Sequence, residues 1–134
     1  MRYLLDTNSV IALSKQVPPV VDRLGHGLAS DILLSTVVLA EIEYGIAKSA
    51  RQAHNRQVFN ALLQGFPVHA FDLSATRHYG PLRAELERRG QLIGPYDMMI
   101  AAQALSLDVT LVTDNTGEFS RVAGLRLENW LRTP

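Results

Sequence analysis

Oxygen-bearing side chains stand at four places in this sequence where an apolar stretch ends or a helix is expected to begin. Asp6 follows the run YLL, and Glu41 lies inside the apolar segment STVVLAEIEYG. Asp97 comes near the start of PYDMMIAAQAL, and Asp114 and Asn115 follow the run VTLVT. Such side chains can bind a divalent cation or transfer protons, which is the chemistry used to hydrolyse phosphate esters.

Each position also has a purely structural interpretation. Asp6 could cap a helix, Asp97 could complement the dipole of a helix N-terminus, and Asp114 and Asn115 are common turn residues. Glu41 is harder to explain in this way, because its neighbours are apolar and a buried glutamate is costly unless it is paired or binds a cation. Glu41 therefore argues most strongly for a functional site.

The elements that would position these residues alternate between short strands and longer helices. The strands are continuous apolar runs, which is typical of a parallel sheet covered on both faces. We expect an α/β fold, a three-layer α/β/α sandwich with a mainly parallel central sheet, formed by a single domain over residues 1–134. The expected strands are 2–6, 31–35, 67–71, 109–113 and 125–128, and the expected helices are 8–14, 20–28, 36–48 (with Thr36 as N-cap), 51–64, 74–89 and 95–106.

This fold would bring the acidic positions to one edge of the sheet, because ligands of parallel α/β sheets bind beyond the carboxyl ends of the strands. Each pair of like charges about 4 Å apart costs roughly 4 kcal/mol at an effective dielectric constant of about 20. Such a cluster is tolerated only with shared protons or bound cations. Oxygen ligands without cysteine favour Mg²⁺, or Mn²⁺ in its place, and the pattern indicates a metal-assisted hydrolysis of a phosphate ester.

The overall composition narrows the class of protein. Basic and acidic residues are balanced at 13 each, so the totals do not indicate a strongly basic nucleic-acid binder. The chain has no cysteine, which fits a reducing cytosol. No apolar stretch approaches the roughly 20 residues of a membrane span. We therefore expect a cytoplasmic protein that does not enter a membrane.

Four blocks of the sequence, in this order, match a known family: LLDTNSVIAL, STVVLAEIEYGIAKS, RAELERRGQLIGPYDMMIAAQAL and LVTDNTGEFSRVAGLRLENW. They resemble PIN-domain ribonucleases, and among these the VapC toxins of bacterial toxin–antitoxin pairs, from about Tyr3 to Trp130. The resemblance implies a Mg²⁺-dependent endoribonuclease that cuts structured RNA such as tRNA and so inhibits translation. It also implies a VapB-type antitoxin as partner, a homodimer and a toxin–antitoxin hetero-oligomer.

The resemblance also implies roles for individual residues. Asp6, Glu41 and Asp97 match the acidic metal ligands of the family, and Asn115 stands where a fourth acid is often found, so these four are the predicted catalytic residues. Asp114 lies one place earlier and is the alternative fourth metal ligand, which leaves open which of the two completes the site. The family frame after the fourth strand is matched by Thr113, Asn115, Glu118 and Phe119.

The expected reaction is an in-line attack of water on the scissile phosphorus, which leaves 5′-phosphate and 3′-hydroxyl ends. Because Asp6 is assigned to the metal, Asn8 is the predicted cap of the first helix. The apolar residues of segment 58–63 and the stretch 11–13 are candidate contacts to an antitoxin or a second copy. The arginines expected to hold the RNA backbone around the acidic pocket are Arg51, Arg56, Arg77, Arg83, Arg88 and Arg89.

Two other functions fit the same architecture. A haloacid-dehalogenase-like phosphatase would also use Mg²⁺. Such enzymes carry D-x-D-x-T after the first strand and a lysine late in the chain, whereas this chain has Asn8 at the third motif position and its last lysine is Lys48. A non-catalytic Rossmann-like binding module would need neither a buried Glu41 nor a metal.

Overall fold

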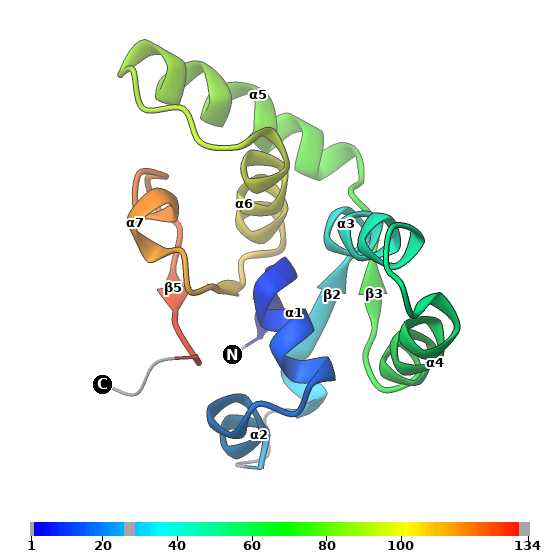
Figure 1. Cartoon of the computed structure of the whole chain (residues 1–134). Coiled ribbons are helices and arrows are strands. Elements are labelled where there is room, and N and C mark those ends of the chain that lie inside the picture. The colour runs from blue at the N-terminus through cyan, green and yellow to red at the C-terminus, as the bar shows by residue number, and fades with distance from the viewer. Residues whose placement is uncertain (1, 26–28, 132–134) are drawn as a thin grey trace.

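The computed structural model describes residues 2–25 and 29–131 of the chain. Within these residues, five strands form one sheet in the order β3-β2-β1-β4-β5, and every neighbouring pair is parallel (Figure 1). The predicted α/β class and parallel sheet are therefore confirmed. The strands are β1 Tyr3–Leu5, β2 Ile32–Ser35, β3 Val68–His69, β4 Thr110–Val112 and β5 Leu127–Glu128.

The helices of the described residues pack in two groups. Helix α1 contacts α2, α3 and α4, and α5 packs against α6, while α3 also contacts α6 and so links the two groups. Figure 1 shows α5 lying across one end of α6, and α3 and α4 beside β2 and β3. None of these helices is long and apolar enough to cross a membrane. They are α1 Thr7–Ser14, α2 Pro18–Leu24, α3 Thr36–Ala47, α4 Gln52–Leu63, α5 Leu73–Arg88, α6 Pro95–Leu107 and α7 Thr116–Phe119, with a short 3₁₀ turn over Ala29–Asp31.

The core explains why the strands are apolar on both faces. Leu4, Leu5, Leu34 and Leu111 have no solvent exposure, and the apolar face of α6, including Ile100, closes over them. Burying such side chains contributes about 1.5–3 kcal/mol each. The strands can therefore be only two to four residues long and still hold the elements that carry the acidic residues.

Several boundaries differ from the sequence prediction: every strand is shorter than expected, most of all β3, which spans Val68–His69 and not 67–71. Helix α2 begins at Pro18, because two prolines at the first helical positions need no hydrogen-bond partner for their missing N–H groups. The predicted end of that helix, Leu28, lies outside the described residues. Ser35, not Thr36, is the N-cap of α3, since its Oγ accepts the N–H of Val37 at 3.1 Å. Helix α7 was not predicted, because four residues are too short to show a period.

Candidate active site

The centre of the sheet is where strand order places a crevice. Strands β2 and β3 lie on one side of β1, and β4 and β5 on the other, so the connections leave β1 and β4 in opposite directions. The carboxyl ends of these two strands are joined by two hydrogen bonds to the carbonyl of Val112, from the N–H of Asp6 at 3.0 Å and from Ser9 Oγ at 3.1 Å. Asp6 therefore leaves the sheet directly at the crevice.

Asp6 is buried and caps α1. Its Oδ1 accepts the backbone N–H of Ser9 at 2.9 Å. The prediction that Asn8 caps this helix is therefore wrong: Asn8 lies within the first turn and is exposed. The cap uses one of the two carboxylate oxygens, so capping and a place in the site are compatible. The capping bond also fixes the direction of the Asp6 side chain.

Glu41 is half-buried on α3 and is held across the crevice by α1. The hydroxyl of Thr7 donates to Glu41 Oε1 at 2.8 Å. This bond offsets part of the cost of burying a carboxylate, but it leaves the negative charge without a positive partner. The expectation that Glu41 needs a partner or a cation is thus met only in part by Thr7.

Asp97 lies in the first turn of α6 and faces three other acids. Its pKa is raised to about 6, first by burial and then by the negative charges of Glu41, Glu118 and Asp6. Like charges raise a carboxyl pKa only when they are near. The structure thus brings Asp6, Glu41 and Asp97, which are distant in sequence, to one place.

Glu118 is a fourth acid of this place, and the sequence analysis gave it no role. It lies in α7, and Asn115 Nδ2 donates to its Oε2 at 3.0 Å. Asn115, one of the predicted catalytic residues, therefore reaches the cluster through Glu118. The signal in the sequence was the GEF segment directly after the TDN turn, which matched the family frame.

Asp114 is oriented toward a different element. Its Oδ1 accepts a hydrogen bond from Asn129 Nδ2 at 2.8 Å, just after β5. The adjacent Asn115 N–H is bound by Thr113 Oγ1 at 2.9 Å, which fixes the turn between them. The two candidates for the fourth position thus have different partners, Asn129 for Asp114 and Glu118 for Asn115.

Positive charge is placed elsewhere in the described part of the chain. No Lys or Arg forms an ion pair there with Asp6, Glu41, Asp97 or Glu118. No three acidic or histidine side chains among these residues are spaced to enclose a metal ion either. The observed pairs are Arg56–Glu43, Arg88–Glu85, Arg89–Glu85, Arg23–Glu128 and Arg126–Asp108.

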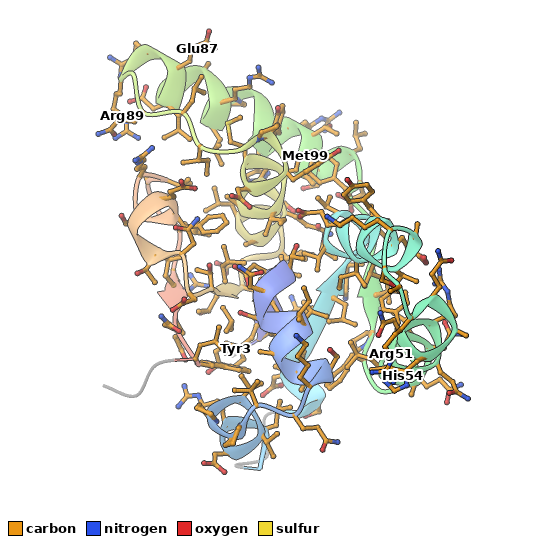
Figure 2. All side chains as sticks on the ribbon, in the orientation of Figure 1. Tyr3, Arg51, His54, Glu87, Arg89 and Met99 are labelled. Atoms are coloured by element: carbon orange, nitrogen blue, oxygen red, sulfur yellow. The ribbon has the colours of Figure 1, made fainter. Side chains whose placement is uncertain are left out.

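The arginines expected to surround the acidic pocket do not gather there. Figure 2 shows Arg51, just before α4, and Arg89, just after α5, on opposite sides of the molecule. Arg56 pairs with Glu43, and Arg83 donates to the hydroxyl of Tyr79 at 2.8 Å. The described structure therefore gives these arginines no common place at the site.

The model of one protein family matches residues 3–125, and that family is the PIN domain. Ribonuclease VapC2 of Rickettsia felis is 40% identical over 133 residues, covering 97% of this chain and 98% of that protein. The chain belongs to the PIN-domain family, among the VapC ribonucleases. It is accordingly a metal-dependent ribonuclease, and neither alternative function drawn from the sequence is supported.

Other relatives agree over nearly the whole chain. The tRNA(fMet)-specific endonuclease VapC of Shigella flexneri is 38% identical over 130 residues, covering 97% of this chain and 98% of that protein. The crystal structure of VapBC2 from Rickettsia felis bound to a promoter DNA fragment contains a chain that matches with a TM-score of 0.91 at 37% identity, covering 97% of this chain and 99% of that one. DNA-bound VapBC from Salmonella typhimurium matches with a TM-score of 0.90 at 34% identity, covering 97% and 98%.

Proposed function

We propose that this chain is the toxin of a toxin–antitoxin pair and inhibits translation by hydrolysing structured RNA with Mg²⁺, at a site formed by Asp6, Glu41, Asp97 and Glu118. The site assignment is supported by the position of these acids at the crevice, where burial and then the charges of Glu41, Glu118 and Asp6 raise the pKa of Asp97. In the described residues no Lys or Arg forms an ion pair with any of the four. Outside a functional site such an arrangement only costs stability.

The chemistry of this donor set fits Mg²⁺, with Mn²⁺ as the substitute. All four side chains offer carboxylate oxygens, and the chain has no cysteine to favour a softer metal. In the described residues no three of these side chains are spaced to enclose an ion, so a bound cation would draw the carboxylates closer together. When bound, Mg²⁺ supplies positive charge that activates water and offsets the charge on the phosphate.

The residues of the chain hold this site in shape. The capping bond to Ser9 directs Asp6, and Thr7 directs Glu41. Asn115 directs Glu118, which supports Glu118 in place of Asp114 as the fourth carboxylate. Asn115 acts in this proposal by positioning Glu118. Hydrolysis by water leaves 5′-phosphate and 3′-hydroxyl ends, because the RNA 2′-hydroxyl takes no part as nucleophile.

A tRNA is the proposed substrate. The support is the Shigella flexneri relative, which is named for cleavage of tRNA(fMet) and is 38% identical over nearly the full length. Because its RNA substrate and the translation machinery are cytoplasmic, we place the toxin in the cytoplasm as well.

The proposed partner is a VapB-type antitoxin, in a hetero-oligomer built on a toxin homodimer. The support is the pair of DNA-bound VapBC structures with TM-scores of 0.91 and 0.90. A groove between α1, α3 and α4, with a volume of about 270 Å³, is the proposed antitoxin site. It joins the two apolar segments predicted as contact surfaces and reaches the acidic site, since its lining includes Ile11, Ile42, Phe59, Leu62 and Glu41.

Cleavage of purified tRNA tests the function directly. The wild-type chain is incubated with tRNA in Mg²⁺ or in EDTA, and the new ends are mapped by sequencing. We expect cleavage in Mg²⁺ alone, with 5′-phosphate ends. Products with 2′,3′-cyclic phosphate ends would overturn the water mechanism, and Mg²⁺-independent cleavage would overturn the metal assignment.

A further inference from the structure

Gln103 is a buried polar residue that the proposed reaction does not use. It lies on α6 with 1% of its surface exposed, among alanines and isoleucine. Both ends of its amide are bound: Oε1 accepts from Ser35 Oγ, and Nε2 donates to the carbonyls of His69 at 3.0 Å and Ala70 at 3.1 Å. A buried amide is costly to place, so three satisfied bonds to distant segments indicate a specific role.

The partners of Gln103 are the start of α3 and the end of β3. Ser35 is the last residue of β2, has no solvent exposure and caps α3 through the N–H of Val37. His69 is the last residue of β3 and pairs with Ser35 in the sheet. One side chain thus connects α6 to the point where β2 becomes α3.

The two connected helices each carry an acid of the site. Glu41 lies six residues after Ser35 on α3, and Asp97 lies six residues before Gln103 on α6. At 1.5 Å per residue, each acid is about 9 Å along its helix from the Gln103–Ser35 bond. The bond therefore fixes the relative position of α3 and α6 between the sheet and the site.

We propose that Gln103 is a positioning residue, which sets the spacing of Glu41 and Asp97 by binding α6 to Ser35 and to the end of β3. This inference rests on the proposed function in one respect, the use of that spacing to hold Mg²⁺. Gln103 does not touch metal or RNA; it acts through the two helices.

The spacing itself is measurable without metal or substrate. The chain has no cysteine, so spin labels attach only at introduced sites. Ala47→Cys on α3 and Tyr96→Cys on α6 are exposed positions for such a pair. We expect one narrow label–label distance distribution by electron paramagnetic resonance in the otherwise wild-type chain. Gln103→Met, which keeps the length and removes the amide, should shift or broaden it.

Metal affinity provides the second readout. Loss of a residue that orients metal ligands typically weakens metal binding about 10–100-fold, and we expect a loss in this range for Gln103→Met in Mg²⁺ titration calorimetry. Ser35→Ala, which also removes the cap of α3, should weaken binding as well. The double variant should lose less than the sum of the two single losses, because the Gln103–Ser35 bond is common to both changes. Val20→Ala, a buried truncation on α2, is the control for destabilisation alone and should keep wild-type affinity.

The outcomes separate this inference from the proposed function. An unchanged label distribution in Gln103→Met overturns the positioning role, whatever the metal does. Wild-type Mg²⁺ affinity in Gln103→Met overturns it as well. A wild-type chain that binds no Mg²⁺ counts against the proposed function, while the label distances still decide the positioning role. Should Gln103→Met not fold, Ser35→Ala, which keeps the Gln103 amide and its bonds to His69 and Ala70, is judged by the same two readouts.

Discussion

Acidic residues occur in two contrasting environments in this protein. At the carboxyl edge of the sheet, Asp97 faces other acids and its pKa is raised to about 6. On α5, Glu85 is partly exposed and binds Arg88 and Arg89, and its pKa is lowered, first by the hydrogen bonds from Arg88. The charged form of a carboxylate is thus destabilised at the edge of the sheet and stabilised on α5.

The difference separates acids that are paired on the surface from acids that we propose to serve the reaction. A pair such as Glu85–Arg88 is free to form wherever two side chains reach each other on a surface. Four acids gather without a base only if another interaction offsets their repulsion. In this protein we assign that role to a divalent cation, which would also bind the RNA phosphate.

The largest expected effect comes from neutralising an acid of the site. Asp97→Asn and Asp6→Asn should lower tRNA cleavage by on the order of 10³-fold, because each removes charge that the metal requires. Asn is a good helix cap, so Asp6→Asn should remain folded. Gel-based cleavage rates measure the loss, and circular dichroism checks the fold. Substantial cleavage by both variants would contradict the site.

Glu118 and Asp114 provide a sharper comparison within the site. Glu118→Gln should lower cleavage roughly 10–100-fold, as expected for a carboxylate that helps to hold the metal. Asp114→Asn keeps an oxygen for Asn129 and should stay within a few-fold of wild type. The same cleavage assay compares them. The opposite order would identify Asp114 as the fourth ligand.

Mg²⁺ should stabilise the fold through the same acids. At 100 times its dissociation constant a ligand adds about 2.7 kcal/mol, which corresponds to a rise of roughly 8 °C in melting temperature for a domain of this size. Thermal melts with and without Mg²⁺ measure the rise. Asp97→Asn should lose most of it, whereas Glu85→Gln should keep it; equal shifts in all three chains would contradict a metal at the site.

Without metal, the acids of the site should make stability fall as pH rises. The pKa of Asp97 is about 6 in the folded state and 3.8 in its unperturbed state. Between these values the folded state retains a proton that the unfolded state has lost, so the free energy of unfolding decreases with increasing pH. Asp97→Asn lacks this penalty and should melt a few degrees above wild type at pH 7. The gap should close toward pH 4.

Urea or thermal unfolding in EDTA at pH 4, 5, 6 and 7 measures this gap. Wild type and Asp97→Asn are compared at each pH, so that other titrating groups cancel. Curves that stay parallel across the range would show that burial and the neighbouring acids do not raise the pKa of Asp97.

A feature of the fold or the site could be predicted from the sequence when it depends on residues that are close together along the chain. Apolar runs and helix periods are local, so the strands and the long helices were predicted. The predicted parallel sheet placed Asp6, Glu41 and Asp97 at one edge, and the structure brings these three together. The family resemblance supplied their roles. Their roles as metal ligands stay a prediction.

What the sequence could not show depends on side-chain direction. The caps of α1 (Asp6, not Asn8) and α3 (Ser35, not Thr36) depend on which of two nearby side chains turns toward the first free N–H groups of the helix. The partner of Asn115 was hidden because α7 is one turn long. The bonds of Gln103 join residues more than 30 positions apart, and no local pattern predicts them.

The smallest effect is expected where acids are paired. Glu85→Gln removes the ion pairs with Arg88 and Arg89 on an exposed helix face, and exposed pairs are screened by water and salt. The melting temperature should change by less than about 2 °C, and tRNA cleavage should stay at the wild-type rate. Because the pKa of Glu85 is lowered, its small contribution is present above about pH 4.5 and is lost as the pH falls. Both differences from wild type should therefore shrink toward acid, but for opposite reasons. In Glu85→Gln the difference shrinks because wild type loses the ion pairs, and in Asp97→Asn it shrinks because wild type gains stability. A loss of cleavage in Glu85→Gln as large as that in Asp97→Asn would remove the distinction between the two environments.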